Sequence, residues 1–121
     1  AREKFSVSPE REKAFDMVRQ FYVLVDNHFK EKKMVQDYAD MLHRSPKTLS
    51  NLFTTCGLPS PLRIIHERIE AEAKRLLLYS QKSAKEITEI LGFEDQATFS
   101  RFFKKMTGES VSEYRKREKR E

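Results

Sequence analysis

The chain has 121 residues, enough for one ordinary domain or two very small ones, and too few for an enzyme with separate substrate and cofactor domains. Charged residues make up 36% of it, with only three glycines and four prolines, a composition typical of a helical, well-solvated protein. The net charge of +5 at pH 7 is consistent with a polyanionic partner.

The sequence gives no sign of export or membrane insertion. Cys56 is the only cysteine, so an internal disulfide is excluded. No stretch resembles a signal peptide, and apolar runs such as "LLLY" are far shorter than the ~20 residues of a membrane-spanning helix. We therefore expect a soluble, cytoplasmic protein with no membrane partner.

The first predicted helix begins after an N-terminal extension or linker, residues 1–8. Ser8 suits the N-cap, Pro9 the first helical position, and Glu10 and Glu12 the positive end of the helix dipole. Apolar residues then recur every three or four positions and predict a core-forming helix. They are Phe15, Val18, Tyr22, Val25 and Phe29, in a stripe widened by Met17, Phe21 and Leu24.

Two short helices follow. Each has apolar residues at positions i, i+3, i+4 and i+7, the spacing of one helix face. Ser45 and Pro46 suit the start of the second of these helices, and Gly57 its end. The apolar quartets are Val35, Tyr38, Ala39 and Leu42 in the first, and Leu49, Leu52, Phe53 and Cys56 in the second.

A longer helix is predicted from Pro61 to about Tyr79, with Ser60 as its cap. Ser83 and Glu86 then have the spacing of a capping box. Two further apolar quartets and Gly108 complete the pattern. The long helix should bury Ile65, Ile69, Ala73 and Leu76, and the later quartets are Ala84, Ile87, Thr88 and Leu91, then Phe99, Phe102, Phe103 and Met106.

The order of short helix, tight break, second helix and glycine therefore occurs twice, with Ser50 matching Ser100. Two helices joined so closely must cross steeply, as in a helix-turn-helix unit. We predict an all-α fold of two helix-turn-helix lobes, residues 9–58 and 81–121, joined by a linker helix over residues 59–80. At ~1.5 Å per residue that helix spans roughly 28 Å, close to the ~34 Å between successive major-groove faces of DNA.

The outward faces of the two second helices contain no acid and hold groups that recognise base edges or phosphates. In the first lobe they are Lys47, Thr48, Ser50, Asn51, Thr54 and Thr55, and in the second Gln96, Ala97, Thr98, Ser100, Arg101, Lys104 and Lys105.

The region from Phe15 to Arg117 resembles the DNA-binding domain of AraC/XylS-type transcription regulators. The resemblance rests mainly on "LGF", "FSRFFKK" and a glycine followed six residues later by "YR". It implies about seven helices, with both recognition helices able to enter the major groove of double-stranded DNA. Carried over by position, the base-reading residues are Lys47, Thr48, Ser50, Asn51, Gln96, Ala97, Thr98, Ser100 and Arg101, with Lys104 nearer the backbone.

The resemblance also implies partners and a cellular location. Similar proteins usually carry a separate N-terminal sensor or dimerisation domain, which we expect to be absent from this chain, and RNA polymerase is a further candidate partner. A bacterial, nucleoid-associated location would follow.

Three positions depart from the family pattern. Val111 replaces a proline, although Ser110 and Glu113 form a capping box that should still start the last helix. Thr88 replaces an alanine, and its hydroxyl needs a partner such as the carbonyl four residues earlier. Arg63 replaces an aromatic residue.

Sequence-specific DNA binding in transcription regulation is thus the leading hypothesis. A non-specific nucleic-acid binder and a helical protein-interaction module are the alternatives. We expect no enzyme, because no nucleophile–base pair or phosphate-cradling loop is present. We expect no metal or cofactor, because the three histidines and Cys56 lack ligand spacing.

Overall fold

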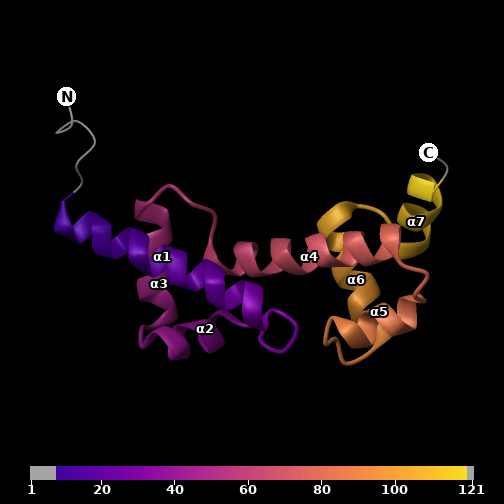
Figure 1. The fold of residues 1–121 in the computed structure, drawn as a ribbon, viewed down its shortest axis with the longest axis horizontal. Helices are drawn as coiled ribbons and strands as arrows, with labels where there is room; N and C mark the ends of the chain where they lie inside the picture. The colour runs from indigo at the N-terminus through magenta and orange to yellow at the C-terminus, as the bar shows by residue number, and fades with distance from the viewer. Residues whose placement is uncertain (1–7, 120–121) are drawn as a thin grey trace. The chain divides into compact units, whose positions relative to one another are not determined.

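The computed structural model describes residues 8–119, and all the regular structure in that part of the chain is helical (Figure 1). This confirms the all-α fold. Most of the predicted extension over residues 1–8, and the last two residues, lie outside the described part. The helices are α1 (Pro9–His28), α2 (Val35–Leu42), α3 (Pro46–Thr55), α4 (Pro61–Tyr79), α5 (Ala84–Ile90), α6 (Gln96–Thr107) and α7 (Val111–Lys119).

The expected N-caps explain where the helices begin. The Ser45 hydroxyl accepts the backbone N–H of Thr48 at 3.1 Å, with Pro46 in the first turn of α3. Ser83 and Glu86 form the expected capping box at the start of α5. The Ser8 hydroxyl likewise accepts the backbone N–H of Arg11, and the Ser60 hydroxyl that of Arg63, each at 3.2 Å.

The chain forms two compact units. The first comprises residues 8–28 and 32–65 of the described chain, and the second residues 29–31 and 66–119. Helix α4 contributes its first residues to the first unit and the remainder to the second.

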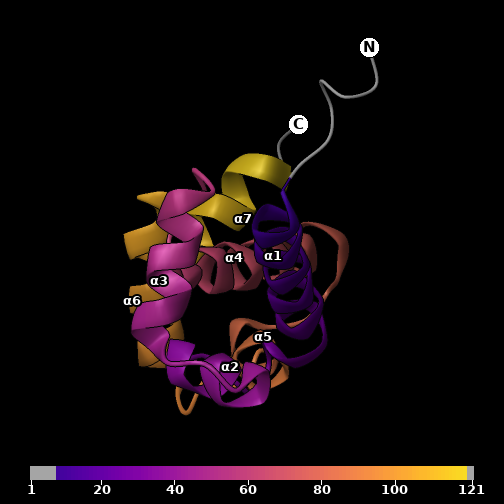
Figure 2. The same cartoon turned by 90° about the vertical axis from the view of Figure 1, so that its left-hand side faces the viewer.

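The core of the first unit is an aromatic cluster in which α1, α2 and α3 meet. Phe21 of α1 is fully buried, and its ring centroid lies 5.5 Å from that of Tyr38 and 5.0 Å from that of Phe53. The Tyr38 hydroxyl donates a hydrogen bond to the Lys32 carbonyl at 2.7 Å. In Figure 2, α2 lies at the lower end of the first unit, below α1 and α3. The cluster therefore fixes how α3 is turned within this unit.

The burial predicted for one residue of the α1 stripe was wrong. Tyr22 is 40% exposed, whereas its neighbour Phe21 is fully buried. Val18, Phe21 and Val25 form the buried line, so the expected face is kept, and Phe21 from its widened edge takes the place expected for Tyr22. The alternating spacings of three and four fit either line, and packing against Tyr38 and Phe53 decides between them.

The core of the second unit lies between α5, α6 and α7. Phe99 and Phe103 are fully buried, and the Phe103 ring lies 5.4 Å from that of Tyr114 in α7. Arg115, also in α7, donates to the carbonyls of Leu77 at 3.0 Å and Ser80 at 3.3 Å. The Leu77 carbonyl belongs to the last turn of α4, where no intrahelical donor remains, and Ser80 directly follows that helix. The arginine of the "YR" motif thus ties α7 to α4.

Two of the three departures from the family pattern have local solutions in the structure. Thr88 is buried, and its hydroxyl donates to the carbonyl of Ala84, four residues earlier, at 2.8 Å. Ser110 and Glu113 form the expected capping box, so α7 begins at Val111 without a proline. Both predictions are confirmed.

The turn between α2 and α3 places a residue other than glycine in the left-handed region. His43 has a φ of 57°, and its N–H and that of Arg44 bond to the carbonyls of Asp40 and Ala39. This pattern is a Schellman cap, whose left-handed position favours glycine. At the end of α6 the same role falls to Gly108, with a φ of 83°.

We predict that His43→Gly raises the free energy of unfolding of the first unit by about 1 kcal/mol, because glycine adopts this backbone conformation without steric cost. Urea unfolding followed by circular dichroism measures the change. His43→Ala is the matched control, since it removes the imidazole and retains the Cβ. Equal stability of the glycine and alanine variants would contradict the prediction.

Candidate nucleic-acid interface

Helix α3 has one buried face and one exposed polar face. Leu49 and Phe53 are fully buried and define the inner side. The predicted site residues Lys47, Thr48, Ser50 and Asn51 are all exposed. Because Lys47, Ser50 and Asn51 are spaced i, i+3 and i+4, they share one face of the helix.

Thr48 has a second role at the start of α3. Its hydroxyl lies 2.9 Å from that of Ser45, whose oxygen also accepts the Thr48 backbone N–H. The N-cap therefore fixes the first turn of α3 and holds the Thr48 side chain in place.

Helix α6 has the same two-sided form. Phe99 and Phe103 are buried, while Gln96, Ala97, Arg101 and Lys104 are exposed. Thr98 and Ser100, also predicted as site residues, are half-buried. The Arg101 guanidinium lies 3.4 Å from the Thr98 hydroxyl, one turn earlier on the helix. The structure thus brings the predicted residues of each lobe onto one helix, with two of them less accessible than the sequence implied.

Asp95 places a negative charge next to the α6 face. It is the N-cap of α6, and its carboxylate accepts the backbone N–H of Thr98 at 2.7 Å. Hydrogen bonds from the Thr98 N–H and hydroxyl hold the pKa of this carboxyl below its usual range, and the Arg101 cation acts in the same direction. The carboxylate is therefore ionised at neutral pH. Sequence reasoning did not assign a role to Asp95, although an aspartate directly before a helix is a typical N-cap.

A histidine of α4 supports the flank of α6. The His66 ring packs edge-on against Phe102, with ring centroids 5.2 Å apart. Burial, and then the nearby Lys105 cation, lower the pKa of His66. The imidazole is thus neutral at pH 7, which suits packing against an aromatic ring.

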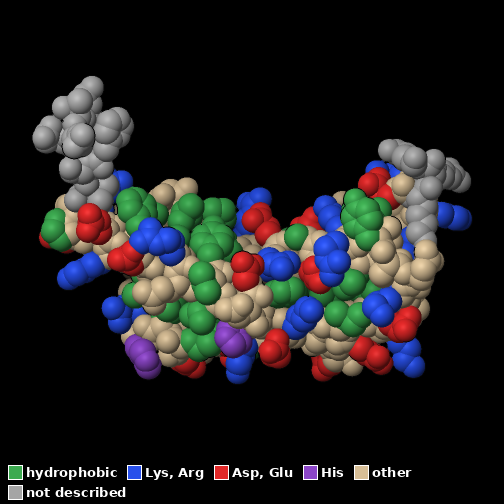
Figure 3. All heavy atoms as spheres, viewed as in Figure 1, with side chains coloured by type: hydrophobic (Ala, Val, Ile, Leu, Met, Phe, Trp, Pro, Cys, Tyr) green, Lys and Arg blue, Asp and Glu red, His purple; other side chains and the backbone are tan. Residues whose placement is uncertain are grey.

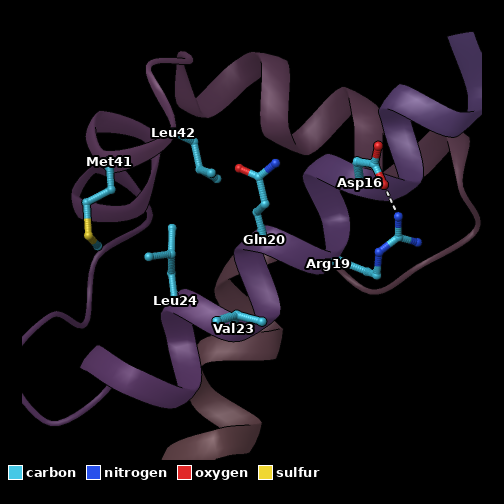
Figure 4. Close-up of a pocket in the computed structure, with 7 residues that line it drawn as sticks. All are labelled: Asp16, Arg19, Gln20, Val23, Leu24, Met41 and Leu42. Atoms are coloured by element: carbon cyan, nitrogen blue, oxygen red, sulfur yellow. Dashed lines mark ion pairs between the residues drawn. The ribbon is translucent and has the colours of Figure 1, made fainter.

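A groove elsewhere on the first unit has a different character. It has a volume of about 510 Å³ and is lined mainly by apolar side chains of α1 and α2, including Val23, Leu24 and Met41 (Figure 4). Asp16 and Arg19, which also line it, form an ion pair with each other. Figure 3 shows hydrophobic side chains over the α1 surface. None of the residues predicted to contact DNA lines this groove.

The described part of the chain has neither a metal-binding cluster nor a membrane-spanning helix. No group of three or more His, Cys, Asp or Glu side chains there has the geometry to hold a metal ion. No helix in residues 8–119 has the length and apolar character needed to cross a membrane.

A family model described as a helix-turn-helix domain matches residues 38–117, about two thirds of the chain. The arabinose operon regulatory protein of Salmonella typhimurium is 36% identical over 92 residues, 76% of this chain and 31% of that protein. This chain belongs to the AraC/XylS family of transcription regulators. The curated relatives matched here are named as operon regulators.

Further relatives support the assignment of this AraC-type chain. The raffinose operon regulator RafR of Pediococcus pentosaceus is 34% identical over 82 residues, 68% of this chain and 30% of that protein. The C-terminal domain of AraT, a response regulator of Geobacillus stearothermophilus, superposes with a TM-score of 0.74 at 29% identity, over 83% of this chain and 84% of that domain. The chain spans about a third of the length of the curated relatives named here.

We predict that Asp95→Asn strengthens binding to duplexes of any sequence while leaving stability nearly unchanged. Asparagine retains the N-cap acceptor and removes a negative charge that repels phosphates. Fluorescence anisotropy on a preferred and a scrambled duplex measures affinity, and thermal unfolding measures stability. Glu94→Gln, which removes the preceding exposed acid outside the cap, shows how much of the gain comes from net charge alone. A gain no larger than that of Glu94→Gln would contradict a special position for Asp95.

Proposed function

We propose that the chain reads double-stranded DNA through the exposed faces of α3 and α6, which enter adjacent segments of the major groove. The observation that carries this proposal is that each helix buries its aromatic side and exposes a polar side without an acid of its own. Lys47, Ser50 and Asn51 supply the α3 face. Gln96, Ala97, Thr98, Ser100, Arg101 and Lys104 supply the α6 face, and Thr48 joins the first.

The side chains divide by the DNA group that each one suits. Arg101 presents a planar guanidinium, which can donate two hydrogen bonds to the N7 and O6 of one guanine. Asn51 and Gln96 suit adenine, while hydroxyl groups suit several bases and the Ala97 methyl suits thymine. Lys104 lies toward the C-terminal end of α6 and presents a point charge, which suits phosphate.

The length of α4 supports the adjacent-segment arrangement. Its 19 residues form one uninterrupted helix. At ~1.5 Å per residue the helix is roughly 28 Å long, near the ~34 Å repeat of the major groove. One chain would then contact two groove segments without a second copy.

The wider role is also proposed from the family. Several relatives are regulators of sugar operons, and the chain covers only about a third of the length of those named above. We infer that it acts in the bacterial cytoplasm as the DNA-binding part of a regulator, together with a separate sensor or dimerisation domain and with RNA polymerase as a further partner. In this role the described residues bind DNA and catalyse no reaction.

We predict that Arg101→Ala weakens binding to a preferred duplex by about 1–3 kcal/mol and relaxes preference at one base position, because a base-edge contact is lost. Lys104→Ala is the matched comparison. It should weaken all duplexes alike and reduce the salt slope by about 1, because a phosphate contact carries no base information.

Competition between the preferred and a scrambled duplex at two salt concentrations measures both effects. The unaltered chain should keep its preference as salt rises, whereas a purely electrostatic binder loses affinity for both duplexes together. Equal losses on the two duplexes for Arg101→Ala would exclude a base-reading role for Arg101. Binding to neither duplex by the unaltered chain would favour a protein-interaction module.

A further inference from the structure

A small groove lies between the start of α1 and the N-terminal half of α3, within the first unit. Its volume is about 230 Å³. Residues from three separate segments line it: α1, the turn after α2, and α3. They include Glu10, Lys13 and Met17 of α1, Arg44 of the turn, and Thr48 and Leu52 of α3.

The rim of the groove carries two exposed cations. Lys13 and Arg44 both reach the groove and are exposed to solvent. One guanidinium nitrogen of Arg44 donates to the neighbouring His43 carbonyl at 3.0 Å, which steadies the side chain and leaves its other N–H groups available. Glu10 also lines the groove, but no ion pair joins it to either cation in the described part of the chain. Because two cations and one acid line the groove, its net charge is positive.

The groove adjoins the face proposed to read DNA, because Thr48 belongs to both. A recognition helix in the major groove has sugar–phosphate backbone on either side, and its N-terminal residues approach the bases most closely. Cations that flank this end of α3, but lie on other segments, are placed beside phosphates rather than bases.

We propose that Lys13 and Arg44 form a backbone-phosphate site of the first unit, which holds the DNA strand next to α3. The proposal rests on the proposed function. It also explains how α3 works with few charges: Lys47 is its only cation, whereas α6 carries Arg101, Lys104 and Lys105. The first unit thus takes its phosphate attraction from α1 and the turn.

The test compares Lys13→Gln/Arg44→Gln with the unaltered chain. Affinity for a duplex selected from a random pool, and for a scrambled duplex, is measured by fluorescence anisotropy over a range of salt concentrations. The double variant should bind both duplexes more weakly and show a salt slope smaller by about 2, since each phosphate contact contributes about 0.9. Its preference between the two duplexes should stay the same.

A matched control separates this local effect from net charge. Arg19→Gln/Lys32→Gln removes the same charge from the same unit at residues that do not line the groove. Its salt slope should change by less than half as much. The conservative pair Lys13→Arg/Arg44→Lys should keep the parent slope, because both charges remain. Far-UV circular dichroism checks that every variant is folded.

Three results would overturn the proposal. The first is an unchanged slope in the double variant while the parent keeps its preference, which leaves the proposed function intact. The second is an equal slope change in the control variant. The third is a loss confined to the selected duplex, which would make the two residues base readers. Failure of the parent to bind either duplex would instead remove the proposed function, and this proposal with it.

Discussion

The structure depends on the burial of one aromatic face in each recognition helix. Phe53 of α3 packs on Phe21, and Phe103 of α6 packs on Tyr114. Burying a phenylalanine side chain contributes about 1.5–3 kcal/mol, so turning either helix by one residue, about 100°, would forfeit several such contributions. The polar face has no comparable packing of its own. Its direction is set by what the opposite face buries, so the hydrophobic core determines which side chains each helix exposes.

The two units use this constraint with different charge distributions. Helix α6 carries three cations, and the ionised Asp95 lies at its first turn. Such an arrangement can temper non-specific attraction to phosphate while the hydrogen-bonding groups of the helix remain. Helix α3 begins at the neutral cap Ser45 and has one cation. Further positive charge beside α3 comes from Lys13 and Arg44, on neighbouring segments.

Local signals in the sequence predicted most of the fold. Serine caps, apolar quartets and terminating glycines are properties of a few adjacent residues, and they located the helices, including the start of α7 despite Val111. Tyr22 was misplaced because Phe21 and Tyr22 both fit the apolar spacing of α1, and only packing on other helices distinguishes the two. The outward residues of α3 and α6 followed from the same periodicity.

The remainder of the candidate site required tertiary structure. Lys13 lies more than thirty positions before Thr48 in the chain, and nothing in the sequence around it indicates that both line one groove. His66 also gave no local signal for its contact with Phe102. Half-burial of Thr98 and Ser100 depends on neighbouring segments as well. Helix periodicity can assign a residue to a face, but it gives no information about which distant residues flank that face.

The central claim is that one chain reads two separate groove segments. Selection of bound duplexes from a random pool, followed by sequencing, tests it most directly. The account predicts an enriched site with two blocks of preferred bases, centred roughly 10 base pairs apart, one helical turn of DNA. Enriched duplexes that share no base preference, or only a single block, would contradict it.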